Sequence, residues 1–187
     1  MSRLRVTRAS FLALVAGAAA APRASADIRD DLRILGFALT VEEVQAALYR
    51  EALRDVPRLD RETRRVLGDL RDHEVEHVDA LRAAIRDAGA RPADRPRVEF
   101  GSALRSRDEF LKLANTLEDA GVSGYNGAAP AFENTDFVAA LASIAQVEAR
   151  HAAVIRLLRG RPPAPLPLDK ASNQGAVRSA YGPYTVE

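Results

Sequence analysis

The sequence predicts an all-α protein: a four-helix bundle made of two antiparallel helical hairpins joined by a long crossover. Four segments repeat apolar residues every three or four positions, which is the period of a helix buried on one face. Short links join the first segment to the second and the third to the fourth, whereas about 15 residues join the two pairs. No segment alternates apolar and polar residues over a sustained stretch, so no sheet is expected.

The composition agrees with a helical, globular domain. Of the 187 residues, 47% are hydrophobic and only 5% are aromatic, so alanine and leucine supply most of the core. The net charge is +1 and acids are interleaved with bases, which argues against a nucleic-acid-binding protein. The absence of cysteine excludes disulfides, zinc ribbons and iron–sulfur clusters. With only three histidines, a metal site must use carboxylates, which favours iron or manganese.

Residues 1–26 have the features of a signal peptide. A basic start is followed by an apolar run over residues 11–21 and by the small-residue sequence ASA at 24–26. The apolar run is too short to span a bilayer comfortably. The stretch 7–12 resembles a twin-arginine export signal, but Ala9 stands where the second arginine belongs. We therefore expect export to the periplasm, the cell envelope or the medium, with an uncleaved N-terminal helix as the alternative.

The first hairpin is expected from two amphipathic segments. The first helix should run from about residue 27 to 55, where Pro57 breaks the pattern. The second should run from about 60 to 88, and Gly89 ends it as a C-terminal glycine does. The link that follows reaches about 50 Å when extended, which is longer than a 25-residue helix at about 1.5 Å per residue. It can therefore cross the whole bundle.

The second hairpin is predicted from the same kind of signals, namely helical periodicity, prolines and caps. The third helix is expected from about residue 104 to 128, before Pro130. The fourth should begin at a cap within 134–136 and continue to about Arg159. The helical domain would thus occupy residues 27–160. Residues 161–187 begin with four closely spaced prolines and are expected to form an extended tail rather than a fifth helix.

Six ionisable residues occupy positions within the apolar stripes. Burying one unpartnered carboxylate costs several kcal/mol, so a whole group of them requires a shared partner. A pair of divalent cations is the simplest such partner. Equal distances from each turn place the glutamates of a hairpin at the same height, about 24 Å along the helices. The six candidate ligands and catalytic residues are Glu42, Glu74, His77, Glu118, Glu148 and His151.

The two halves of the chain repeat the same spacings. In the first and third helices a stripe glutamate precedes a tyrosine by seven residues, giving the candidate neighbours Tyr49 and Tyr125. In the second and fourth helices a stripe glutamate precedes a histidine by three residues. This pattern indicates an internal duplication and a two-fold site. The tyrosines are expected to pack in the core, from where they can hydrogen-bond the site.

A competing motif overlaps the second helix. His73-Glu74-Val75-Glu76-His77 matches HExxH, the zinc-protease signature in which both histidines bind zinc and the glutamate is the base. That interpretation leaves three stripe glutamates unexplained, and Val147 occupies the position that mirrors His73. The zinc protease is therefore the minor alternative. His73 is expected beside the metal site or at the surface.

Six segments carry a resemblance to a known family: FALTVE at 37–42, ALYREAL at 47–53, HEVEHVDAL at 73–81, LEDAGV at 117–122, YNGAAP at 125–130 and VEARH at 147–151. They resemble the exported ferritin-like domain proteins, which are related to desiccation-related and stress proteins. The resemblance covers about residues 28 to 160 and implies the ferritin-like fold and, by matching position, the same six ligands. Gln45 departs from the pattern, since a second glutamate is common there, but it lies off the stripe and is expected to leave the site intact.

The leading hypothesis is a di-iron site, alternatively di-manganese, that oxidises ferrous iron or handles peroxide in oxidative or desiccation stress. By spacing, Glu74 and Glu148 would bridge the two ions, while Glu42 and Glu118 would be terminal ligands. The main alternative is a non-enzymatic envelope or stress protein with a structural metal site. The expected partners are metal ions with O2 or peroxide, and neither nucleic acid nor, after signal cleavage, a membrane. A homo-oligomer is compatible with the sequence, but a closed ferritin cage is not expected, because the tail replaces the short fifth helix.

Overall fold

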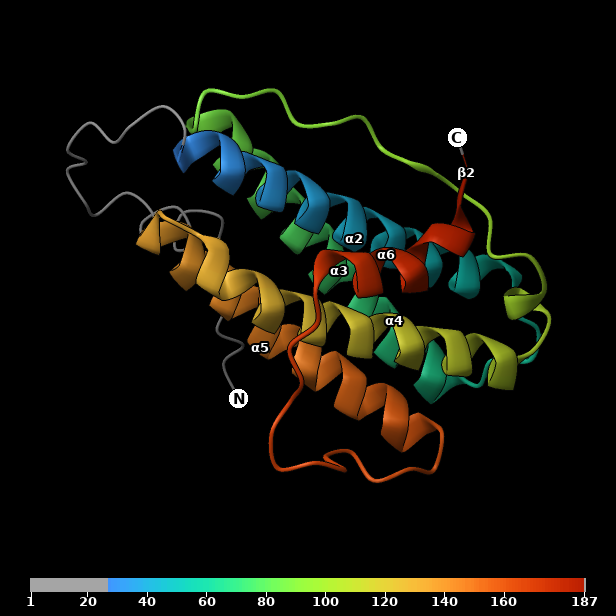
Figure 1. The fold of residues 1–187 in the computed structure, drawn as a ribbon. Coiled ribbons are helices and arrows are strands. Elements are labelled where there is room, and N and C mark those ends of the chain that lie inside the picture. Colours follow the sequence, from blue (N-terminus) through green and yellow to red (C-terminus); the bar gives the residue numbers. More distant parts are fainter. Residues whose placement is uncertain (1–26, 187) are drawn as a thin grey trace, which may run out of the picture.

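Four long helices form the protein, as expected from the sequence. The structure, a computed structural model, describes residues 27–186, so the expected signal peptide at 1–26 lies outside the described residues. Helix α2 (Asp27–Asp55) pairs with α3 (Arg61–Asp87), and α4 (Arg107–Ala128) pairs with α5 (Thr135–Leu158) (Figure 1). The all-α bundle of two hairpins is therefore confirmed.

Side-chain caps fix where three of these helices begin. Asp60 accepts a hydrogen bond from the Thr63 N–H at 2.8 Å, and Asn134 accepts one from the Asp136 N–H at 2.9 Å. The third helix begins at Arg107, three residues later than expected. Ser106 caps it by accepting from the Glu109 N–H, and the preceding residues, Gly101–Leu104, form the 3-10 helix η1 instead.

The crossover runs along the outside of the bundle (Figure 1). Its strand β1 (Arg97–Val98) pairs antiparallel with β2 (Thr185–Val186), with Arg97 opposite Val186. The expectation of no sheet was therefore wrong, because two-residue strands are too short to show alternation. The crossover is also held by Arg95, whose Nε donates to the buried carboxylate of Glu43 at 2.8 Å.

The C-terminal tail is not extended throughout, which corrects the expectation for residues 161–187. Helix α6 (Gln174–Tyr181) packs against α4 and is followed by the 3-10 helix η3 (Gly182–Tyr184). The four prolines at 162–167 precede Asn173, which caps α6 by accepting from the Ala176 N–H at 2.9 Å. Because Val177 and Tyr181 are buried, the tail is part of the folded domain.

Glycines on α4 make room for this tail. A Cβ atom at Gly124 would lie 2.9 Å from the Val177 side chain, and one at Gly127 would lie 1.9 Å from the Ser172 carbonyl oxygen. One residue before Gly124, the Ser123 carbonyl accepts a hydrogen bond from the Ser172 N–H at 2.8 Å. The close approach of the tail backbone to α4 therefore requires residues without side chains.

Gly127→Ala should release the tail from α4. The added methyl group cannot coexist with the Ser172 carbonyl, so the tail must move away and lose its backbone bond to Ser123. Hydrogen exchange of residues 172–181 should accelerate at least tenfold, while α3 should exchange as before. Gly68→Ala on α3 is the control, since nothing lies within 4 Å of its Cβ position. Unchanged tail protection in Gly127→Ala would refute this account of tail docking.

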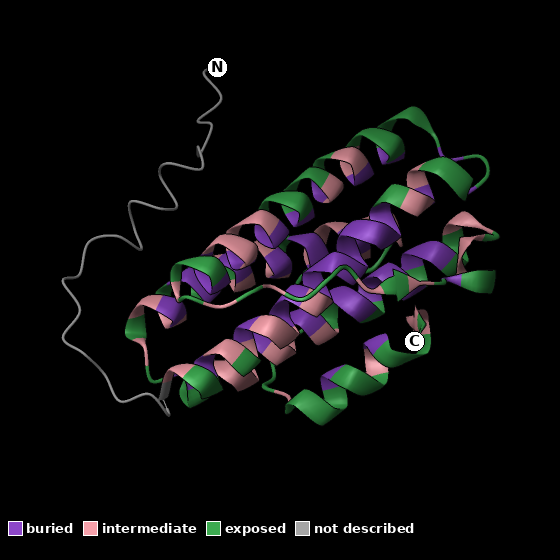
Figure 2. Cartoon of the chain, turned by 90° about the horizontal axis from the view of Figure 1, so that it is seen from above, coloured by how far each residue is buried: buried purple, intermediate pink, exposed green. Residues whose placement is uncertain are grey.

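The apolar core consists of two clusters separated by a polar layer. One contains Leu48, Leu67 and Phe110, and the other contains Leu39, Leu81 and Ile144. Figure 2 shows that buried residues line the inward sides of the long helices. Helix α5 is long and apolar enough to cross a membrane by length and composition alone, but in this fold it packs within the bundle and contributes to the polar layer. That layer contains the residues singled out from the sequence.

Candidate metal centre

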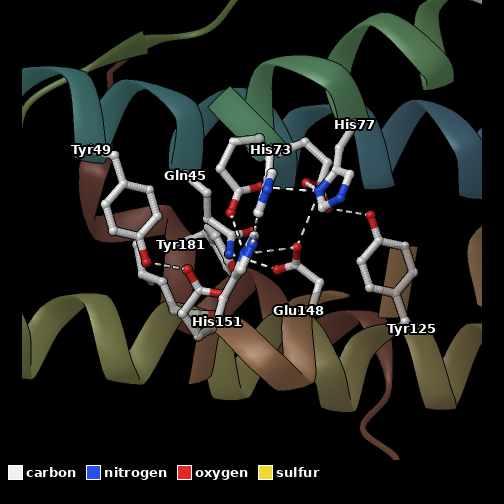
Figure 3. Close-up of polar contacts among 12 residues, drawn as sticks. Gln45, Tyr49, His73, His77, Tyr125, Glu148, His151 and Tyr181 are labelled. Carbon is white, nitrogen blue, oxygen red and sulfur yellow. Dashed lines mark hydrogen bonds and ion pairs between the residues drawn. The ribbon is translucent and has the colours of Figure 1, made fainter. Parts of the chain in front are cut away.

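All six predicted ligands lie together in the polar layer between the two apolar clusters. Each of them is at most 8% exposed, so all six are buried. Each long helix contributes, and α3 and α5 contribute a glutamate and a histidine one turn apart because a spacing of three keeps both on one helix face. Figure 3 shows His77, Glu148 and His151 pointing toward one another. The six are Glu42 from α2, Glu74 and His77 from α3, Glu118 from α4, and Glu148 and His151 from α5.

These side chains form two overlapping groups, each of which could hold a metal ion. In each group one ligand atom per residue can be chosen so that all lie within 4.8 Å of one another. Glu74 and Glu148 belong to both groups, as expected for shared carboxylates. The remaining members are Glu42 and His77 in the first group, and Glu118 and His151 in the second. A donor set of carboxylates and imidazoles suits iron or manganese.

The two shared carboxylates face the histidines differently. Glu74 directs Oε1 to His151 Nδ1 at 2.8 Å and Oε2 to His77 Nδ1 at 3.3 Å. Glu148 directs a single oxygen, Oε1, to both rings, at 3.2 Å from His77 Nδ1 and 3.5 Å from His151 Nδ1. Glu74 thus offers one oxygen to each half of the centre, whereas Glu148 offers the same oxygen to both.

Burial and mutual repulsion keep protons on this cluster when metal is absent. Burial raises the pKa of Glu42 to about 7, although His77 opposes the shift. Burial and the charges of Glu148 and Glu74 raise the pKa of Glu118 well above its usual range. The carboxylates around His77, Glu42 first, outweigh burial and raise the pKa of that imidazole as well. A metal ion must displace such protons, so its affinity should increase with pH.

The metal-free protein should lose stability as the pH rises toward neutral. The folded-state pKa of Glu42 lies above its ordinary value of 4.5, so its contribution is complete below about pH 4.5 and is lost through about pH 7. The raised pKa values of Glu118 and His77 act in the same direction. Urea unfolding in chelator at pH 5, 6, 7 and 8 measures the trend. Glu42→Gln should flatten it, and a wild-type stability that rises over this range relative to Glu42→Gln would contradict the assignment.

The two tyrosines connect the halves of the duplicated pattern. Tyr49 on α2 donates to Glu118 Oε1 on α4, and Tyr125 on α4 donates to Glu42 Oε1 on α2. Each hydroxyl therefore holds the non-shared glutamate of the opposite half. The rings are buried in the two apolar clusters, so both expectations, core packing and hydrogen bonding to the site, are confirmed.

Two further residues, Gln45 and Tyr181, adjoin the site. Gln45 is fully buried and its Nε2 donates to Glu148 Oε2 at 2.9 Å, so it supports a ligand, and the six predicted ligands assemble with glutamine at this position. Its spacing of three from Glu42 was the available signal. Tyr181 lies with its hydroxyl 3.1 Å from Gln45 Oε1 and 2.6 Å from the Leu117 carbonyl oxygen. It was missed because the tail was expected to be extended.

His73 lies beside the site, as expected, and not in it. Its Nδ1 is 3.0 Å from His151 Nε2, and the two rings stack with centroids 5.3 Å apart (Figure 3). Among residues 27–186, neither candidate metal group includes His73. The structure thus does not assemble the pair of histidines that the HExxH interpretation requires.

A comparison with protein families matches residues 30–161 to the ferritin-like domain. The match covers more than half of the chain, includes all six candidate ligands and ends just after α5. A search of curated proteins found no match to the chain.

Proposed function

Because the chain belongs to the ferritin-like domain family, we propose that it is a two-metal protein that binds iron, or alternatively manganese, and reacts with O2 or peroxide. The observation that carries the proposal is the pair of overlapping four-residue groups that share Glu74 and Glu148. Two ferrous ions held there would supply two electrons for the reduction of O2 or peroxide. Sharing two carboxylates keeps both ions close enough to act together.

Each residue has a distinct role in this proposal. Glu42 with His77, and Glu118 with His151, would each bind one ion, while Glu74 and Glu148 bind both. The hydroxyls of Tyr49 and Tyr125 fix the orientation of the non-shared glutamates, as outer hydrogen bonds to metal ligands generally do. The two apolar clusters flank the layer, and the six ligands between them are buried.

Oxygen uptake separates an enzyme from a protein with a structural metal. We expect metal-free protein loaded anaerobically with two ferrous ions per chain to consume O2 when air is admitted, and His151→Ala to lose most of that rate. Ferrous oxidation is followed with a ferrous chelator and O2 with an electrode. Stabilisation by metal without O2 or peroxide consumption would instead favour the alternative of a structural site in an envelope or stress protein.

A cavity favours a second candidate function, oxidation of a small apolar organic molecule. The cavity has a volume of about 280 Å³ and lies between α2, α4 and the start of α6. Tyr125 and Gly121 line its inner end, and a Cβ at Gly121 would lie 3.3 Å from Glu148 Oε2. An engineered apolar cavity of about 150 Å³ holds benzene, so a two-ring hydrocarbon would fit here.

Filling the cavity should block such a molecule without affecting the metal centre. Ala38→Phe places a ring in the cavity wall and should abolish binding of naphthalene, measured by its fluorescence, while ferrous oxidation continues. Ala139→Phe, on the exposed side of α5, should leave both unchanged. Equal naphthalene binding by the two variants would remove the second candidate.

We also propose that the protein is exported and acts in the envelope or outside the cell. Support comes from the signal-like pattern of residues 1–26, which ends in the small-residue sequence before Asp27. Mass spectrometry of the mature protein should therefore find Asp27 as its first residue. The tail does contain a short helix, so its composition no longer argues against a cage, and the oligomeric state stays a prediction.

A further inference from the structure

Buried polar atoms without a hydrogen-bond partner gather in one half of the metal centre. Among the side chains of residues 27–186 these atoms are Glu74 Oε1, Glu118 Oε2, Glu148 Oε1 and His151 Nδ1. They belong, one each, to the four residues of the second ligand group. In the first group, His77 Nδ1 is instead hydrogen-bonded to Glu42 Oε2 at 3.0 Å. Since buried polar atoms almost always have partners, four such atoms facing one point indicate a place for a cation.

His73 gives the second group an oriented histidine. The 3.0 Å contact between His73 Nδ1 and His151 Nε2 requires one of the two nitrogens to carry the proton. If His151 Nε2 donates, its Nδ1 becomes a lone pair aimed at Glu74 Oε1, 2.8 Å away. Two lone pairs at that distance repel each other, and a cation beside both removes the repulsion, as a proton on either atom does when metal is absent. This tautomer is the one in which His151 can bind a metal through Nδ1.

The first half of the centre has no counterpart of this contact. The repeat that relates Glu74 to Glu148 and His77 to His151 places Val147 opposite His73. A valine side chain has no polar atom, so it cannot orient His77. The departure from two-fold symmetry therefore favours the group that contains His151.

A second departure from the repeat acts on a shared ligand. Gln45 holds Glu148 Oε2 at 2.9 Å, which turns Oε1 toward both histidines. The repeat places Gly121 opposite Gln45, and a Cβ there would lie 3.4 Å from the Tyr181 hydroxyl. The missing side chain thus admits Tyr181, which contacts Gln45 from the tail. Glu148 is the one metal ligand that Gln45 contacts, and it belongs to both metal positions. Gln45 therefore affects both positions.

We propose that the two metal positions are unequal, and that the position formed by Glu74, Glu118, Glu148 and His151 takes the first ion. His73 is the positioning residue for His151, and Gln45 is the positioning residue for Glu148. The proposal rests on the two-metal centre proposed above. It adds an order of filling, and that order is set by His73, which binds no metal itself.

Titration of metal-free protein with Co²⁺ tests the order without any turnover. Calorimetry and visible absorbance should show two separate steps of one ion each in the wild type. His77→Ala should keep the tighter step and lose the weaker one, whereas His151→Ala should lose the tighter step. His73→Val, which copies Val147, should weaken the tighter step by about 10–100-fold, the usual loss when a partner of a ligating histidine is removed.

A matched pair of substitutions separates positioning from a general effect on folding. His73→Gln keeps a hydrogen-bond acceptor and should restore at least part of the affinity that His73→Val loses. Gln45→Leu should weaken both steps by similar factors, because Glu148 is shared. All variants are compared at equal helicity by circular dichroism, so that a misfolded chain is recognised before titration.

Three results would overturn the proposal: two equal steps in the wild type, an unchanged tighter step in His73→Val, or loss of the tighter step in His77→Ala. Wild-type protein that binds no Co²⁺ above the level of a Glu74→Gln, Glu148→Gln double variant would refute the two-metal centre itself. The two failures are therefore distinguishable, since in the first set the wild type still binds two ions, whereas in the last it binds none.

Discussion

Glu74→Gln should abolish binding of both metal ions and reduce ferrous oxidation by at least about 100-fold. Glu74 is the residue that offers one carboxylate oxygen to each histidine, so its replacement by a neutral amide of the same shape removes a ligand from both positions. The change creates no cavity, and the helix should remain folded. Metal content after gel filtration and the initial rate of ferrous oxidation are the two measurements.

Glu43→Gln is the matched control for this prediction. Glu43 is a buried glutamate on α2, next to a predicted ligand, but its carboxylate faces Arg82 and Arg95 at 2.6 and 2.8 Å and lies outside both metal groups. Its replacement should destabilise the protein by about 1–3 kcal/mol, because a buried carboxylate loses its charge-assisted hydrogen bonds to two partly exposed arginines. Metal binding should persist. A Glu43→Gln variant that loses metal as completely as Glu74→Gln would mean that burial, and not ligand position, explains the loss.

Metal should raise the melting temperature of the wild type by roughly 5–10 °C when free metal exceeds the dissociation constant about 100-fold. Without metal, the polar layer contains four carboxylates in contact, and burial or neighbouring carboxylates raise the pKa of Glu42 and Glu118. A cation relieves that repulsion only in the folded state, where the ligands lie together. Differential scanning fluorimetry with Fe²⁺ or Mn²⁺, then with excess chelator, gives the shift.

The melting experiment also has an internal reference. Glu74→Gln should show little shift with metal, because both ions depend on that carboxylate, whereas Glu43→Gln should show the same shift as the wild type from a lower starting temperature. A large metal-dependent shift in Glu74→Gln would place the stabilising ion elsewhere on the chain.

The bundle could be predicted from the sequence because its signals are local and repeated. Helical periodicity, Pro57, Gly89 and the cap near Asn134 set the helices to within a few residues of the structure. The site was predictable for a related reason. The stripe glutamates lie at equal distances from each turn and recur with the same spacings, which determines where their side chains lie in an antiparallel bundle. Ionisable residues in apolar stripes are also informative, because burying them without a partner is costly.

What escaped prediction depends on contacts between distant parts of the chain. The tail was expected to be extended because of its prolines, but Val177 and Tyr181 find a groove that Gly124 and Gly121 leave open on α4. The role of Gln45 was missed because its partner, Glu148, lies 103 residues away. Such contacts have no signature in the periodicity of a single helix.

The most direct test of the central claim is anomalous X-ray diffraction, at the iron edge, from crystals of the iron-loaded protein. The account predicts two peaks in the polar layer, both beside Glu74 and Glu148, one nearer His77 and the other nearer His151. It would be contradicted by the absence of iron from this layer, or by a single metal held between His73 and His77.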